Sequence, residues 1–460
     1  MTEESKTIVA VATPAVSSAI AIIRISGKDA LRVSKSVFFG FSNTKIIEPR
    51  KMYFGKINAG KYNDECLGVF FENPKSYTGE DVVEFYCHGS YVLASGIVRY
   101  LVEECGLSYA EGGDFTYRAF KNGKLDLTEA EGVYDMIMSQ TEAEVRGAYS
   151  LLSGELKNKI IAIQDSIIDT RANTEVVIDY PEEDIEEYTK TQLLEKTQNI
   201  LTELDNLLST YRYGKFMRLG VRVALLGKPN VGKSSLMNSL LGYDRAIVTN
   251  EKGTTRDTLT EQYIYNDLRF ILTDTAGIRK AVSLPEQMGV ERSELALKES
   301  DIIVFVVEKN DLELLDIKSV INDLEMMPKT VVVFNKADKF DEHSSDDEKN
   351  IIGALNIIPN AILSVSAKTG LGIDKLKQCL FDQSGYVAVG GATLNNERQY
   401  FLVNEAKTHV KRALDNLATT PIELISSDLY DAQNALGKIT GIIGSDAVAD
   451  KIFKKFCVGK

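Results

Sequence analysis

The sequence predicts a multidomain protein with α/β and all-α parts: an N-terminal α+β domain, a helical domain, and an inserted α/β domain with a mostly parallel sheet. Its 460 residues exceed one core at roughly 100–200 residues per domain. Strands and helices alternate over residues 217–380, which is typical of a parallel sheet covered by helices. Helical periodicity on either side of that stretch predicts a helical domain made of residues 121–216 and 381–460.

The N-terminal domain, residues 1–120, begins with two β-rich apolar runs around a Pro and Ser break in TIVAVATPAVSSAIAIIRI, residues 7–25. These runs predict two strands joined by a loop. Further strands are expected at CLGVFF, residues 66–71, and DVVEFYC, residues 81–87. Helical spacing follows over residues 89–104, so this domain mixes both kinds of element.

The helical domain is divided between two parts of the chain. In residues 127–211, Leu, Ile, Glu, Lys and Gln recur at helical spacing, which predicts two or more long helices with a break at YPEED, residues 180–184. Helical periodicity returns after about residue 395. We expect the last helices to pack on the earlier ones, with the α/β domain inserted between them. Three domains in a row is the alternative.

The α/β domain opens with a buried strand at residue 221, in VRVALLGKPNVGKSSL, where the strand leads into a Gly-rich loop and a helix. Apolar strands are expected at residues 270–274, 302–307 and 330–335. Near-continuous apolar runs such as IIVFVV indicate strands buried on both faces.

Composition excludes several classes of protein. The net charge of −13 opposes general attraction to a polyanion. No apolar run reaches the ~18 residues that a membrane span needs, and the first residues carry an acidic pair, so we expect a cytoplasmic location. Five scattered cysteines and three histidines do not suggest a disulfide framework or a zinc site.

The Gly-rich loop has the spacing of a phosphate-binding motif. Gly227 to Ser234 fits G-x-x-x-x-G-K-[ST] between a predicted strand and helix. Backbone N–H groups would cradle the phosphates, Lys233 would reach the β and γ phosphates, and the Ser234 hydroxyl would bind Mg²⁺. The expected contacts of this loop and its helix are Gly227, Asn230, Val231, Gly232, Lys233, Ser234 and Ser235.

Three more motifs follow in the order of a GTP-binding domain. Asp274-Thr275-Ala276-Gly277 ends an apolar strand, which places the Asp274 carboxylate beside the phosphates to support the metal. In Asn335-Lys336-Ala337-Asp338, the Asp338 carboxylate would accept hydrogen bonds from the guanine N1–H and exocyclic amine. Adenine lacks this pair of donors. Ser366-Ala367-Lys368 would flank the base. Together the motifs predict GTP as the bound nucleotide.

The catalytic apparatus is less evident from the motifs. The segment GTTRD, Gly253 to Asp257, lies where a GTPase has its mobile switch, and Thr255 would reach Mg²⁺. The alternative is that the segment is a simple turn whose residues bind no metal. Ile278 stands where small signalling GTPases have a water-orienting Gln, and no arginine finger is evident. Glu286 and Glu291 are alternative candidates to orient the water, and either could instead be a solvated surface carboxylate.

Segments along the whole chain resemble one family. TIVAVATP…IIRISG, YTGEDVVEFYCHGS, RAFKNGKLDLTEAEGV, GKPNVGKSSL, GTTRD and the final FCVGK are similar to the tRNA-modification GTPase family called MnmE or TrmE. The resemblance implies a folate-binding N-terminal domain that also forms the homodimer, a helical domain and an inserted GTPase. It implies action with the flavin-dependent partner MnmG at C5 of the wobble uridine (U34) of certain tRNAs. The one-carbon donor would be 5-formyl- or 5,10-methylene-tetrahydrofolate.

The same resemblance assigns residues. Arg24, Glu84, Lys124 and Lys460 would contact the folate, in agreement with the suitability of carboxylates for a pterin donor pair and of cations for a glutamyl tail. The loop TPAVSSAIA and the GGDF stretch (112–115) depart from the family's usual TPPGRGG-like and PGEF sequences. Cys457 would act in chemistry on the tRNA, or is a half-buried thiol.

In the GTPase domain the resemblance implies a potassium ion in place of the arginine finger. It also implies that the GTPase domains of the two copies meet across the dimer in a potassium-dependent way. The implied K⁺ ligands are Asn230, Thr249, Glu251 and Thr254. Glu286 falls where the family's water-orienting glutamate lies, which favours it over Glu291.

Two other functions share parts of the pattern. A GTP switch in ribosome assembly would carry similar GKPNVGKSSL and GTTRD stretches, but we expect such a protein to add a basic RNA-binding domain, which a net charge of −13 does not favour. A folate-binding module with a vestigial GTPase would not need the complete set of nucleotide motifs.

Overall fold

The computed structural model describes residues 6–179, 186–228, 230–242, 260–274, 297–308, 329–339, 349, 353, 359–387, 390–417, 422–441, 443 and 446–460. The chain divides into two compact units. Unit 1 comprises Met1–Ile137, Ala148–Asn206 and Phe401–Lys460, and unit 2 comprises Met138–Gly147 and Leu207–Tyr400. The finer domain boundaries expected at residues 120, 216 and 380 stay a prediction.

The first sheet belongs to unit 1 and has the strand order β3-β4-β5-β2-β1-β6. All its neighbours pair antiparallel except β1 and β6. The strands predicted near the N-terminus are confirmed, whereas β3 and β6 were not anticipated. The strands are β1 (Ile8–Val11), β2 (Ile20–Ser26), β3 (Met52–Ala59), β4 (Tyr62–Phe71), β5 (Val82–His88) and β6 (Ser108–Tyr109).

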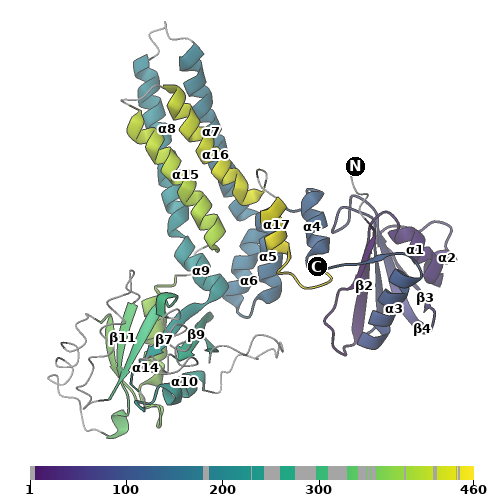
Figure 1. The fold of residues 1–460 in the computed structure, drawn as a ribbon, viewed down its shortest axis with the longest axis horizontal. Coiled ribbons are helices and arrows are strands. Elements are labelled where there is room, and N and C mark those ends of the chain that lie inside the picture. The colour runs from purple at the N-terminus through teal and green to yellow at the C-terminus, as the bar shows by residue number, and fades with distance from the viewer. Residues whose placement is uncertain are drawn as a thin grey trace, which may run out of the picture. The chain divides into compact units, whose positions relative to one another are not determined.

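Three helices cover one face of this sheet (Figure 1): α1 (Ala30–Val37), α2 (Phe39–Ser42) and α3 (Tyr91–Glu103). Strand side chains alternate between faces, so Ile23 and Ile25 enter the core beneath these helices while Arg24 points to the other face. On β5, Phe85 is in the same core and Glu84 shares the face of Arg24. The polar pair is therefore on the sheet face that these helices leave uncovered.

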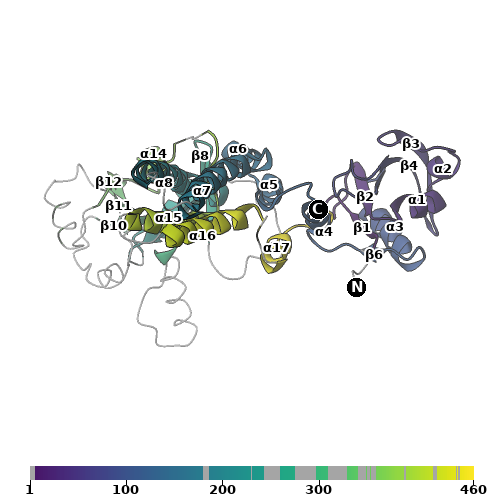
Figure 2. The same ribbon diagram turned by 90° about the horizontal axis from the view of Figure 1, so that it is seen from above.

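The remaining helices of unit 1 come from the middle and the end of the chain. Helices α7 and α16 lie side by side in both views (Figures 1 and 2), and two hydrogen bonds to Gln433 join them, from Gln164 Nε2 at 3.0 Å and Arg171 Nη1 at 2.9 Å. The expected packing of late helices on middle helices is present. The helices that lie wholly or partly in unit 1 are α4 (Asp114–Lys121), α5 (Leu127–Met138), α6 (Glu142–Leu152), α7 (Glu155–Asp179), α8 (Glu186–Ser209), α15 (Glu397–Asn416), α16 (Ile422–Thr440) and α17 (Asp446–Phe453).

Among the helices described, none is long and apolar enough to cross a membrane.

Unit 2 contains the mostly parallel sheet that the sequence predicts, in the order β12-β11-β10-β7-β9-β8. Among its described strands, β8 and β9 pair antiparallel and the other neighbours pair parallel. The strands are β7 (Val221–Leu226), β8 (Thr260–Tyr265), β9 (Leu268–Asp274), β10 (Ile302–Val307), β11 (Lys329–Phe334) and β12 (Ala361–Ser364). The named helices are α9 (Tyr211–Leu219), α10 (Lys233–Leu241), α14 (Ile373–Ser384) and the single 3₁₀ turn η1 (Ala337–Lys339).

The order of these strands creates a switch point at β7. From β7 the chain adds β9 on one side and β10 on the other. In open parallel sheets, ligands bind beyond the carboxyl ends of the strands at such a point. The Gly-rich loop that follows β7 is therefore in the expected place for a ligand.

Candidate functional site

The phosphate loop of unit 2 connects β7 to α10 and needs its glycines. Gly232 caps α10 with φ +95°, and a Cβ there would lie 2.4 Å from Asn335 Nδ2. Asn230 also adopts a left-handed conformation, with φ +66°. The loop thus turns tightly before the helix, so its first backbone N–H groups face outward for an anion.

Lys233 is held within this loop. Its Nζ donates to the carbonyl oxygens of Gly227 at 2.8 Å and Lys228 at 3.0 Å, and the side chain is largely buried. Burial lowers the pKa of Lys233 from its ordinary value, and the nearby Asp274 carboxylate partly opposes that change. An ammonium group that is held by two carbonyl oxygens is suited to bind a phosphate.

Ser234 and Asp274 form the predicted pair for a metal ion. Ser234 Oγ donates to Asp274 Oδ2 at 3.0 Å, and Asp274 Oδ1 is buried with no hydrogen-bond partner among the residues that the structure describes. A hydroxyl oxygen beside a free carboxylate oxygen is a donor set that Mg²⁺ prefers. The residues present therefore fit the predicted magnesium ion.

The guanine motifs are joined to the phosphate loop by Asn335. Its Nδ2 donates to Val231 O at 2.9 Å, and its Oδ1 accepts from Ala367 N at 3.1 Å. One side chain therefore links the phosphate loop, the end of β11 and the loop after β12. Asn335 is buried, so these bonds are shielded from water.

Asp338 is placed to recognise a base. Its Oδ1 accepts from the Ser366 hydroxyl at 2.5 Å, and this bond is the main reason that the pKa of Asp338 is below its ordinary value. The exposed Lys368 adds a smaller effect in the same direction. The carboxyl is therefore ionised at neutral pH and acts as a hydrogen-bond acceptor.

Other predicted nucleotide residues are placed as follows. Lys336 contacts the loop through its ammonium group, Val231 is buried under it, and Ser235 is exposed in the first turn of α10. Outside the described residues lie Thr249, Glu251, Thr254, Thr255, Thr275, Ala276, Gly277 and both candidate glutamates, Glu286 and Glu291.

A second cluster, in unit 1, surrounds Arg24 and Glu84. The two residues face each other across β2 and β5, with Arg24 Nε 2.7 Å from Glu84 Oε1. Tyr86, one strand repeat further along β5, donates its hydroxyl to Glu84 Oε2 at 2.7 Å. The sequence analysis did not select Tyr86, although its i+2 spacing from Glu84 places both on one sheet face.

The C-terminal tail closes over this pair. Arg24 Nη1 donates to the Gly459 carbonyl at 3.0 Å. Gly459 has φ +96°, and a Cβ there would be 2.6 Å from Ala12 Cα, so only glycine fits. Burial lowers the pKa of Lys460, and the neighbouring Arg24 lowers it further. Two crowded cations beside one carboxylate favour an anionic ligand.

Aromatic rings flank the same arginine. The Tyr77 and Phe115 ring centroids each lie 5.6 Å from Arg24 Cζ, and neither residue was anticipated. Lys124 instead donates to the Pro74 carbonyl at 3.2 Å, at the start of the loop that carries Tyr77. In the described part of the chain, no contact joins Lys124 to Arg24. The structure thus brings together three of the four predicted folate residues.

Comparison with known proteins decides the family. A family model described as the MnmE helical domain matches residues 127–457, and one described as the GTP-binding protein TrmE N-terminus matches residues 7–124. The tRNA modification GTPase MnmE of Streptococcus pyogenes serotype M4 is 38% identical over 469 aligned residues, covering 100% of both chains. The protein of the same name from serotype M28 is also 38% identical. The chain belongs to the MnmE family.

Solved structures are similar over part of this MnmE-family chain. A GTP-binding protein from Sulfolobus solfataricus in complex with GDP is 15% identical and covers 48% of this chain and 67% of its own, with a TM-score of 0.30. An Era variant from Aquifex aeolicus bound to GDP and AlF₄⁻ is 26% identical, with coverage of 41% and 65% and a TM-score of 0.28. Scores this low carry no argument about function.

Cys457, the residue that the family resemblance singled out for tRNA chemistry, has an exposed thiol. Its carbonyl oxygen accepts from Lys460 N at 3.4 Å, so its backbone helps to fold the tail toward Arg24. The exposure does not support a half-buried thiol, and it leaves the predicted chemistry untested.

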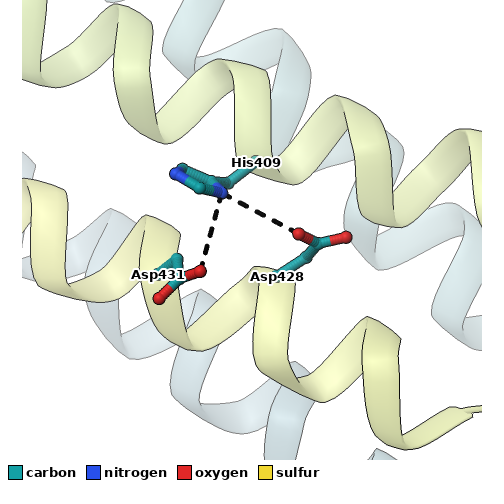
Figure 3. Close-up of side chains that lie close together, drawn as sticks. All are labelled: His409, Asp428 and Asp431. Carbon is teal, nitrogen blue, oxygen red and sulfur yellow. Dashed lines mark ion pairs between the residues drawn. The ribbon is translucent and has the colours of Figure 1, made fainter.

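One group of side chains in this MnmE-family chain has the composition of a metal site. His409 Nδ1 on α15 lies 3.8 Å from Asp428 Oδ1 and 3.9 Å from Asp431 Oδ2 on α16 (Figure 3). However, Arg412 Nη2 is 2.9 Å from the same Nδ1, and its Nε is 3.2 Å from Asp428 Oδ1. Because a permanent cation already compensates the carboxylate, the group is an ion-pair link between α15 and α16.

Proposed function

We propose that this chain binds and hydrolyses GTP in unit 2, and that it does so as part of tRNA modification. Membership of a family of tRNA modification GTPases makes the chain a GTP hydrolase. The observation that carries the guanine specificity is the Asp338 carboxylate held by Ser366, on a segment that Asn335 ties to the phosphate loop.

The roles of the residues follow from their chemistry. Backbone N–H groups of the phosphate loop and the Lys233 ammonium bind the phosphates, and Asp338 orients the base. Ser234 and Asp274 would hold Mg²⁺, which when bound neutralises phosphate charge. These groups position the γ-phosphate for attack by water.

Potassium and Glu286 are proposed from the family resemblance. Asn230, Thr249, Glu251 and Thr254 would hold K⁺, and Glu286 would orient the water. The left-handed backbone conformation of Asn230 in the phosphate loop supports its assignment as a K⁺ ligand. GTP turnover measured in KCl and in NaCl tests the ion, and equal rates would rule it out. Turnover of Glu286→Ala tests the glutamate, and normal hydrolysis would remove its role.

For unit 1 we propose a folate-binding site around Arg24, Glu84 and Lys460, with Lys124 at its margin. The two cations suit a glutamyl tail, and the Glu84 carboxylate suits a pterin donor pair. The rings of Tyr77 and Phe115 beside Arg24 are suited to a flat heterocycle. The ligand would be 5-formyl- or 5,10-methylene-tetrahydrofolate, which when bound supplies the one-carbon unit.

We propose that the modification is addition of an aminomethyl or carboxymethylaminomethyl group at C5 of the wobble uridine, made together with MnmG. The test is mass spectrometry of tRNA nucleosides from cells lacking this protein. Loss of the C5-modified uridine at the wobble position is expected. An unchanged nucleoside profile would refute the proposal.

A second copy of the chain and a cytoplasmic location complete the proposal. Supporting the homodimer, Met52, Phe54, Leu67 and Ile20 are exposed apolar side chains of the N-terminal sheet. Phe54 and Leu67 are direct cross-strand partners, so they form a continuous apolar surface. Sedimentation of the full chain would give a dimer mass, and a monomer at all concentrations would contradict this part of the proposal.

A further inference from the structure

Glu308 occupies a position that neither the motifs nor the proposed mechanism uses. It directly follows β10, whose carboxyl end lies between β7 and β11 in the sheet. Glu308 therefore stands between the strand that leads into the phosphate loop and the strand that leads into the Asn335 to Asp338 motif. Side chains at this edge of a parallel sheet are the ones that meet a ligand.

The Glu308 carboxylate is engaged with Lys336. Lys336 Nζ lies 2.6 Å from Glu308 Oε2 and donates to the Asn230 carbonyl at 3.0 Å. The two side chains are 26% and 32% exposed, so the pair is partly shielded from water. One ammonium group thus connects the end of β10 to the backbone of the phosphate loop.

The carbonyl that Lys336 holds belongs to a strained part of the loop. Asn230 has φ +66° and Lys336 itself has φ +64°, conformations that non-glycine residues adopt infrequently. The next carbonyl, that of Val231, is held by Asn335. Two neighbouring residues of one motif therefore fix two consecutive carbonyls of the other, and only the Lys336 contact depends on a flexible side chain.

We propose that Glu308 is a positioning residue for guanine-nucleotide binding: it keeps the Lys336 ammonium on the Asn230 carbonyl and so holds the phosphate loop in its binding conformation. Lys336 has four rotatable side-chain bonds and would lose this geometry without a partner charge. The inference rests on the proposed binding of guanine nucleotide in unit 2.

Dissociation of the fluorescent nucleotide mant-GDP from the full chain with Mg²⁺ tests the inference. Glu308→Gln keeps the shape and removes the charge, and we expect it to raise the dissociation rate about threefold to tenfold, the range for a partly shielded charge-assisted contact. In a Lys336→Met background the same substitution should change nothing, since its effect passes through that lysine. Thermal unfolding of the nucleotide-free chain should be unchanged, which a merely structural role would not give.

Glu299 provides a matched control. Glu299 lies three residues before β10, whereas Glu308 directly follows this strand, and Glu299 pairs with Arg222. Glu299→Gln should leave the dissociation rate unchanged, and Glu308→Asp should give an intermediate rate. The inference is overturned by a rate within twofold of wild type for Glu308→Gln, by an equal effect in the Lys336→Met background, or by an equal effect of Glu299→Gln. If the wild-type chain itself binds no mant-GDP, the proposed function fails instead.

Discussion

At the scale of single residues, the two candidate sites have one hydrogen-bonding arrangement in common. Each has a carboxylate that a hydroxyl group orients: Ser366 donates to Asp338 in unit 2, and Tyr86 donates to Glu84 in unit 1. A carboxylate has about four lone-pair sites, so a carboxylate that accepts one bond (Asp338) or two (Glu84, also bound by Arg24) can still accept another. In both proposed sites the carboxylate is therefore held in a fixed orientation before any ligand binds.

Replacing Asp338 by Asn should exchange the preferred base. The amide offers N–H to the oxygen that xanthine carries at C2, and it keeps only one uncharged acceptor oxygen for guanine's two donors. We expect GTP affinity to fall about a hundredfold, with a gain for xanthosine triphosphate, as charged hydrogen bonds are lost. Competition binding with both nucleotides measures the change, and unchanged GTP affinity would remove the role of Asp338.

Tyr263 predicts a different effect at one residue. Its side chain is fully buried, its ring stacks on Phe270 with centroids 5.1 Å apart, and its hydroxyl has no partner among the described residues. Tyr263→Phe removes an unsatisfied polar group, so the free energy of unfolding should stay equal or rise by about 1 kcal/mol. Urea unfolding measures it. Tyr265→Phe is the control on the same strand, because Tyr265 donates to Gln378 at 3.0 Å, and a loss for Tyr263→Phe as large as for the control would contradict the account.

The sequence could identify residues that belong to a motif of fixed spacing, and it could not identify residues whose role depends only on which side chains the fold brings into contact. Lys233, Ser234 and Asp338 lie in continuous motifs and occupy the expected places. Tyr86 on β5, Tyr77 in the loop before β5 and Phe115 on α4 are ordinary aromatic residues until the fold places them beside Arg24 or Glu84. Lys124 was selected from its motif, but the structure shows it donating to the Pro74 carbonyl rather than contacting Arg24.

At the scale of elements, burial explains which strands the sequence predicts. Strands β10 and β11 are buried on both faces and therefore appear as continuous apolar runs. Strands β3 and β8 were not predicted. Their burial alternates with exposed or half-buried positions, and residues such as Lys56 and Gln262 interrupt the apolar pattern. Such strands are stabilised by their neighbours rather than by their own composition.

Helix α5 begins with a reciprocal cap. Asp126 Oδ1 accepts from Glu129 N at 2.8 Å, and Glu129 Oε2 accepts from Asp126 N at 2.7 Å. The other oxygen, Asp126 Oδ2, is buried and has no hydrogen-bond partner in the described part of the chain, with Lys157 Nζ 3.7 Å away. Burial is the main reason that the pKa of Asp126 is above its ordinary value of 3.8.

This raised pKa predicts how stability depends on pH. The folded chain binds the Asp126 proton more tightly than the unfolded chain, so its contribution is complete below about pH 4 and is lost as pH rises through the folded pKa. Asp126→Asn keeps the capping oxygen and removes the charge. Its free energy of unfolding relative to wild type should therefore increase between pH 4 and pH 7, by about 1 kcal/mol.

Denaturant unfolding at a series of pH values measures this difference. Asp126→Ala is the control, since relative to Asp126→Asn the loss of the cap should destabilise the chain by about 1 kcal/mol at every pH. A difference between Asp126→Asn and wild type that stays constant or shrinks as pH rises would show that burial does not govern this carboxyl.

At the scale of the whole molecule, both ends of the chain contribute to one site in unit 1. Arg24 lies on the second strand from the N-terminus, and Gly459 and Lys460 are the last residues of the chain. The helical segments in between return the chain to the first sheet, where Val458 forms a bridge with Gly112. Unit 1 is therefore complete only when the chain has passed through unit 2 and back.

Ending the chain at Cys457 should remove folate binding. The deletion removes the Gly459 carbonyl that Arg24 binds and the Lys460 cation, so we expect affinity for 5-formyltetrahydrofolate to fall about a hundredfold or more, as for two charged contacts. Calorimetry measures the affinity, and GDP binding should be unchanged. Lys455→Gln, an exposed lysine in the same segment, is the control. Equal folate affinity of the shortened and full chains would contradict the site.

The most direct test of the account is calorimetric titration of the full chain with GDP and with ADP, with Mg²⁺ and K⁺ present. The account predicts saturable binding of GDP at one site per chain and no detectable binding of ADP, because the Asp338 carboxylate accepts from donors that adenine lacks. A folded chain that binds neither nucleotide, or binds both equally, would contradict it.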